Sequence, residues 1–144
     1  AAIIQGADKG GGVAERSKAF KGKTVWITGA SSGIGEAMAY AMYAAGAHVI
    51  LSSRRTEELL RVRDQCLQNG INEGPEPVVV ALDLSKPEQM AAVVAQVQKE
   101  LGTPGVDFIV HNGGVSTRAL AEEMAWEVDE SVLKINYLGP VALT

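Results

Sequence analysis

The sequence has few of the residues that disulfides and metal sites require. Its 144 residues include one cysteine, Cys66, and two histidines, His48 and His111. A single cysteine excludes an intrachain disulfide framework and any multi-cysteine zinc site. The acidic residues after position 121 have no clear ligand spacing, so we interpret them as a solvated face. We therefore predict no metal site.

Long apolar runs and an excess of basic charge are also absent. No stretch approaches the roughly 20 consecutive apolar residues of a membrane-spanning helix. The chain has 13 Lys and Arg against 17 Asp and Glu, which gives a formal net charge of −4. A general nucleic-acid binder needs a basic face, so we expect no nucleic-acid partner. The hydrophobic fraction of 47% suffices for the core of one domain.

From residue 23 onward, predicted strands and helices alternate, whereas residues 1–22 are polar and glycine-rich and indicate a flexible lead-in. The predicted strands are 24–28, 48–52, 77–82 and 106–110. The predicted helices are 34–45, 56–69, 90–101 and 126 to the end. In the first helix the apolar positions are Ile34, Ala37, Met38, Ala41, Met42 and Ala45. Such alternation predicts an α/β fold, a Rossmann-type doubly wound parallel sheet of about four strands with helices on both faces.

Three local features give further expectations. Residues 85–88 have the form of a capping box, in which the Ser85 hydroxyl and the Glu88 carboxylate satisfy first-turn amides. Pro140 removes a backbone donor and should kink the last helix. The fourth strand should be an unpaired edge, and the last helix should expose apolar side chains, so we expect the isolated chain to behave poorly. These side chains are Leu133, Ile135, Leu138, Val141 and Leu143.

A glycine-rich turn joins the first strand to the first helix. Its sequence is Thr28-Gly29-Ala30-Ser31-Ser32-Gly33-Ile34-Gly35. Glycines here let the backbone approach a bound group closely, and the helix start presents free amides and a positive dipole end to a phosphate. A tight turn without any ligand is the alternative interpretation. The position after a buried strand favours phosphate binding.

The spacing Thr-Gly-x-x-x-Gly-x-Gly resembles the glycine motif of the classical short-chain dehydrogenase/reductase family. Further matches follow in order: Asp83-Leu84, Asn112-Gly113-Gly114 and Asn136. The resemblance implies that 23–144 is an NAD(P)-binding Rossmann domain, truncated at its C-terminal end. It implies cofactor-binding roles for Thr28, Gly29, Ser31, Ser32, Gly33, Ile34, Gly35, Asp83, Leu84, Asn112, Gly113 and Gly114. It implies a catalytic, proton-relay role for Asn136.

Details of these motifs resemble one group of that family, dehydrogenase/reductase family member 7. The details that carry this resemblance are the run 25–28, the pair Gly113-Gly114 where most members have Ala-Gly, and the run 135–139. By this resemblance the complete protein would associate with the endoplasmic reticulum membrane through a segment outside this chain, and would otherwise be cytoplasmic. We also expect the complete protein to form a homo-oligomer.

The end of the second predicted strand bears on the choice of cofactor. An acid there would hydrogen-bond the adenosine ribose and repel a 2′-phosphate. The sequence instead has Ser53 followed by Arg54 and Arg55. Arg54 offers a planar fork to a 2′-phosphate, and Arg55 adds positive charge. Two solvated arginines are the alternative, but together with the glycine turn the pair favours NADP (NADPH) over NAD.

Two other nucleotide-binding interpretations fit less well. The run 22–24 ends like a P-loop, but position 17 is Ser where that motif needs Gly, and the run precedes a strand rather than a helix. A methyltransferase that uses S-adenosylmethionine would want an acid at the end of the second strand, where Ser53 stands.

The classical family transfers a proton with a Tyr and with a Lys four residues later. Here Ala44, Ala47 and Val141 follow the three tyrosines at that spacing, so the chain has no Tyr-x-x-x-Lys. The resemblance implies hydride transfer between NADP(H) and a small-molecule carbonyl or alcohol substrate, with the catalytic Ser, Tyr and Lys outside this chain. We expect the chain alone to be inactive. The alternative is a non-catalytic NADP-binding module or regulator that ends near residue 144.

Overall fold

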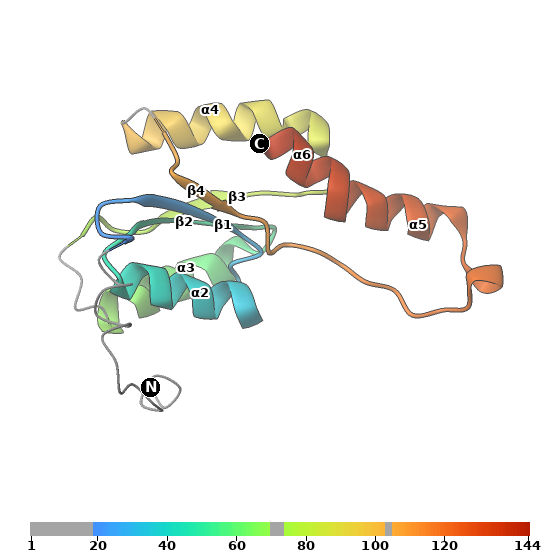
Figure 1. Cartoon of the computed structure of the whole chain (residues 1–144), viewed down its shortest axis with the longest axis horizontal. Coiled ribbons are helices and arrows are strands. Elements are labelled where there is room, and N and C mark those ends of the chain that lie inside the picture. The colour runs from blue at the N-terminus through green and yellow to red at the C-terminus, as the bar shows by residue number, and fades with distance from the viewer. Residues whose placement is uncertain (1–18, 70–73, 103–104) are drawn as a thin grey trace.

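The computed structural model describes residues 19–69, 74–102 and 105–144 (Figure 1). Most of the predicted lead-in lies outside these ranges. The strands are β1 (Thr24–Thr28), β2 (His48–Ser53), β3 (Val78–Ala81) and β4 (Phe108–Val110). The helices are α2 (Gly33–Ala44), α3 (Thr56–Asn69), α4 (Met90–Leu101), α5 (Trp126–Leu133) and α6 (Gly139–Leu143), with a π-helical turn at Lys134–Leu138 and 3₁₀ turns at Pro87–Gln89 and Ala121–Glu123. No helix in the described ranges is long and apolar enough to span a bilayer.

The four strands form one parallel sheet in the order β3-β2-β1-β4. Helices α2 and α3 lie on one face of this sheet, and α4 and α6 lie on the other, while α5 extends past it (Figure 1). The predicted doubly wound α/β fold is therefore confirmed. In the described part of the chain β4 is an edge strand, because only β1 pairs with it.

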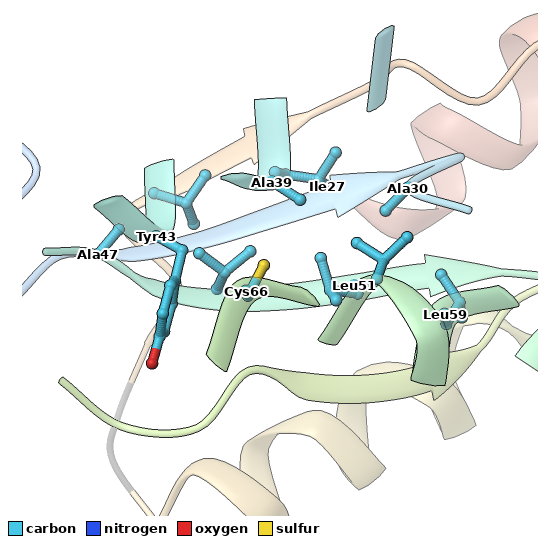
Figure 2. Close-up of a cluster of buried hydrophobic side chains, with 11 residues drawn as sticks. Ile27, Ala30, Ala39, Tyr43, Ala47, Leu51, Leu59 and Cys66 are labelled. Atoms are coloured by element: carbon cyan, nitrogen blue, oxygen red, sulfur yellow. The ribbon is translucent and has the colours of Figure 1, made fainter. Parts of the chain in front are cut away.

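Alternate side chains of the central strands fill two cores, as expected for a sheet covered on both faces. Val25 and Ile27 pack with Val49 and Leu51 beneath α2 and α3. Figure 2 shows this cluster, to which Ala39 and Tyr43 of α2 and Leu59 and Cys66 of α3 contribute. The other core lies toward α4 and α6. It contains Trp26, Ile50, Val80, Leu82, Leu84, Met90, Val97 and Leu143.

The apolar face predicted for the first helix is wrong in part. The residues of α2 that are buried are Gly35, Ala39 and Tyr43, which recur every four positions. Ala37 and Ala41 are exposed, and Ile34 is 74% exposed. Gly35 and Ala39 are small, so the helix backbone can lie close to the sheet at these positions. The buried face of α2 therefore lies beside the face that the larger apolar residues predicted.

The predicted capping box at 85–88 is also wrong. Ser85 Oγ donates to Asp83 Oδ1 at 2.7 Å instead of accepting from a first-turn amide. The 3₁₀ turn that leads into α4 has Pro87 at its start and no side-chain cap. Asp83 instead opens a separate turn over residues 83–86, in which its carboxylate accepts the Ser85 hydroxyl and amide and its carbonyl accepts the Lys86 amide.

The last helical segment runs from α5 through the π turn into α6. The Gly139 amide bonds the Lys134 carbonyl, five residues back, so the helix widens before Pro140, which has no amide to donate. Leu133, Leu138 and Val141 are exposed, as predicted. The expectation is wrong for Leu143, which is 3% exposed, and for Ile135, which packs on the second core, because α6 folds back over the sheet.

Candidate functional site

A cleft of about 330 Å³ opens where the carboxyl ends of all four strands meet. The chain returns to opposite sides of β1 as β2 and β4, and such a switch point leaves a crevice at the strand ends. Ten of the predicted cofactor-binding residues line this cleft. They are Gly29, Ser31, Ser32, Arg54, Arg55, Asp83, Leu84, Asn112, Gly113 and Gly114.

The turns after β1 and β4 pack backbone to backbone in the floor of the cleft. Gly29 has a φ of +67°, and a Cβ on it would lie 2.8 Å from the Gly113 Cα. The Asn112 side chain joins the two turns, because its Nδ2 donates to the carbonyls of Thr28 and Gly29 at 3.1 and 3.2 Å. The glycines and Asn112 thus hold this part of the cleft in one shape.

Thr28 does not line the cleft but supports it from below. Its hydroxyl oxygen is buried and accepts the amides of Asn112 and Gly113 at 3.1 and 2.9 Å. The same hydroxyl lies 3.3 Å from the Val110 carbonyl, to which it donates. A single side chain therefore fixes the turn that follows β4.

Replacing Thr28 by Val should lower the free energy of unfolding by about 2–4 kcal/mol, because two partly buried amides lose their acceptor. Thr28→Ser keeps the hydroxyl and is the matched control, with an expected loss below about 1 kcal/mol. Urea unfolding of the complete protein measures both variants. Equal stability of Thr28→Val and wild type would show that these bonds contribute nothing.

The glycine-rich turn leads directly into α2. Gly33 and Ile34 are exposed at the start of this helix, and Gly35 is buried against the Gly29 carbonyl and Asn112. Ser32 is the N-cap residue, and its side chain makes no capping hydrogen bond. Among the described residues no side chain accepts the first amides of α2, and free amides at a helix N-terminus are the groups that bind anions.

The two arginines after β2 stand at the rim of the cleft and are exposed. Arg55 donates from one guanidinium nitrogen to Ser31 Oγ at 3.0 Å and to Ser32 Oγ at 2.7 Å. These two hydrogen bonds connect the turn after β2 to the glycine turn. Ser53 and Ser52 also line the cleft. The sequence pattern points to Ser53 only as the position without an acid, and it gives no sign of Ser52.

Asp83, after the end of β3, also lines the cleft, and its neighbours keep it ionised. Hydrogen bonds from the Ser85 hydroxyl and amide, together with the charge of Arg54, lower the pKa of its carboxyl against the opposing effect of burial. Arg54 and Asp83 thus place one charge of each sign on the walls of the cleft.

The predicted catalytic residue Asn136 lies on the π turn and lines a second, adjoining cavity of about 490 Å³ with His111 and Gly114. Its side chain is fixed by the Val115 backbone. Its Oδ1 accepts the Val115 amide at 2.9 Å, and its Nδ2 donates to the Val115 carbonyl at 2.7 Å. Single π turns inside α-helices occur frequently at functional sites. Among the described residues no cluster of His, Cys, Asp and Glu could hold a metal ion.

Comparisons with known proteins agree with this architecture. The human protein named dehydrogenase/reductase SDR family member 7 is 42% identical over 120 residues, which are 83% of this chain and 35% of that protein. A Drosophila melanogaster protein named as like member 7 is 43% identical over 85% of this chain and 37% of its own length. This chain spans little more than a third of the length of these two relatives. The predicted resemblance to the member 7 group is confirmed.

A solved structure of L-sorbose reductase from Gluconobacter frateurii, complexed with NADPH and L-sorbose, matches with a TM-score of 0.77 and 31% identity. The match covers 86% of this chain and 45% of that one. A family profile described as short chain dehydrogenase matches residues 23–144, which include every strand and helix described above. The chain therefore belongs to the short-chain dehydrogenase family.

Proposed function

We propose that the complete protein transfers a hydride between NADP(H) and a small-molecule carbonyl or alcohol, and that this chain holds the adenosine and pyrophosphate part of the cofactor. The cleft at the strand ends is the observation that carries the proposal. It combines a helix N-terminus without side-chain caps, a glycine floor and a cationic rim. Helix N-termini and glycine turns bind the pyrophosphate of dinucleotides, and a nearby arginine accommodates a 2′-phosphate.

Within the cleft each wall has a chemical role. The free amides at the start of α2 would bind the pyrophosphate, and the glycines at 29, 113 and 114 leave room for it. The Asp83 carboxylate and the neighbouring Leu84 would hold the adenine. When it is bound, the nicotinamide supplies or accepts the hydride.

The preference for NADP rests on the end of β2. Ser53 occupies the place where an acid would repel a 2′-phosphate, and Arg54 is exposed beside it at the rim. Arg55 and the hydroxyls of Ser31 and Ser32 already form a hydrogen-bonded group there. These donors would surround a 2′-phosphate with charge-assisted hydrogen bonds.

For the chemical step, this chain would contribute Asn136. The two bonds to Val115 hold its amide in place, and the π turn leaves the backbone around it outside the regular helical bonding pattern. We propose that Asn136 supports a proton path toward the substrate. This chain has no Tyr-x-x-x-Lys, so in this proposal the Tyr that would donate the proton, and the Lys four residues after it, would come from outside this chain.

Cofactor binding by the complete protein tests the proposal. NADPH and NADH are titrated separately, and the change in nicotinamide fluorescence is recorded. We expect NADPH to bind about 10–100-fold more tightly than NADH, because a 2′-phosphate gains one or two charge-assisted bonds. Competition by adenosine 2′-phosphate but not by adenosine 5′-phosphate would place the gain at the 2′ position. Equal affinities for NADPH and NADH would contradict the NADP assignment, and failure to bind either would contradict the proposal as a whole.

A further inference from the structure

Glu36 stands at an unfavourable place for a protein that binds an anionic cofactor. It follows Gly35 in the first turn of α2, the end of the helix that would receive the pyrophosphate. A carboxylate there interacts favourably with the helix dipole, but it competes with a bound phosphate and repels it. Hydrogen bonds from Arg61 and Tyr40 lower the pKa of Glu36, so its negative charge persists at neutral pH.

Arg61 of α3 forms an ion pair with the Glu36 carboxylate and so neutralises its charge. Its two terminal nitrogens donate to the two carboxylate oxygens of Glu36 at 2.8 and 2.9 Å, as a bidentate fork. The hydroxyl of Tyr40 donates to the same carboxylate at 2.6 Å. The Glu36 side chain is 19% exposed, so solvent screens this pair less than a fully exposed one.

A second carboxylate fixes Arg61 in this position. Its Nε donates to Glu58 Oε2 at 2.8 Å, one turn back along α3. Each of the three guanidinium nitrogens of Arg61 thereby donates to a carboxylate. Arg61 is not among the residues that line the cleft. Any effect of Arg61 on a ligand in the cleft is therefore indirect, and Glu36 is its partner nearest in sequence to the glycine turn.

We infer that Arg61 is a positioning residue for cofactor binding, which neutralises Glu36 and turns its carboxylate toward α3 so that the start of α2 remains attractive to a dinucleotide phosphate. This inference rests on the proposed function, because it assumes that the phosphate binds at α2. It differs from the direct contacts proposed above, since Arg61 does not line the cleft.

The test compares NADPH affinity in Arg61→Gln with that in the double variant Glu36→Gln, Arg61→Gln of the complete protein. Arg61→Gln leaves Glu36 unpaired, and we expect about fivefold weaker binding at low ionic strength, with a smaller loss at high salt. The double variant removes both charges and should bind within about twofold of wild type. Arg61→Lys should recover part of the loss. Arg63→Gln removes the same charge from the same helix away from Glu36 and is the matched control.

The outcomes separate this inference from the proposed function. If wild type binds NADPH but Arg61→Gln binds equally well, the inference is wrong and the function stands. If the double variant remains as weak as Arg61→Gln, the tie between the helices matters rather than the charge, which also overturns the inference. Thermal unfolding of each variant identifies any loss of binding caused by misfolding, and Arg61→Lys then provides the folded comparison. A wild type that binds no NADPH overturns both.

Discussion

Substituting Arg54 with Asp should weaken NADPH binding about 100-fold while leaving NADH binding equal or stronger. Arg54 is exposed at the rim of the cleft, directly after the strand end where an acid would bind the adenosine ribose. The substitution removes a charge-assisted bond to the 2′-phosphate, which is typically worth about 1.5–3 kcal/mol, and it also adds a repulsive charge. The new carboxylate could instead accept the ribose hydroxyls of NADH.

The measurement is the ratio of the two dissociation constants in the complete protein. Lys99→Asp makes the same charge change in an exposed position on α4, and should leave the ratio within about twofold of wild type because the distant charge is screened. If Arg54→Asp weakens the binding of NADPH and of NADH equally, Arg54 stabilises the structure of the rim and does not select the cofactor.

Replacing Gly35 with Ala should lower the free energy of unfolding by about 3–5 kcal/mol, the largest stability effect that we expect in this chain. A Cβ at this position would collide with the carbonyl oxygen of Gly29 and lie 2.5 Å from Asn112 Nδ2. The Gly29 atoms are backbone and cannot move away as a flexible side chain would. Overpacking typically costs 1–3 kcal/mol, and displacement of Asn112 adds the loss of its two bonds to the β1 end.

Gly33 provides the contrast, because it lies two residues earlier in the same turn. It has a φ of +59° and no atom within 4 Å of an added Cβ. Gly33→Asn should therefore cost less than about 1 kcal/mol, since Asn tolerates the left-handed conformation. Denaturant unfolding of the two variants checks the prediction. Similar losses at both positions would mean that backbone conformation, rather than close packing, determines the cost of changing these glycines.

The accuracy of the predictions depended on whether a feature is local or tertiary. The order of strands and helices was predictable, because buried parallel strands are short apolar runs and the turns between them contain Gly, Asn or Asp. The predicted bounds of the helix at 56–69 agree with α3, and β3 and β4 are shorter than predicted only at their ends. The capping box failed because the Ser85 hydroxyl donates to the Asp83 carboxylate, two residues earlier, instead of accepting a first-turn amide.

Residue order alone determined the α/β class, the glycine turn and the pair of arginines after β2, because each depends on neighbours in sequence. Tertiary structure decided which stripe of α2 is buried, since Gly35, Ala39 and Tyr43 face the sheet only once β1 and β2 are paired. It also decided that Leu143 is buried and that Arg61 reaches Glu36 across 25 positions. Packing between distant segments sets these contacts, and helical periodicity within one segment does not specify its partner.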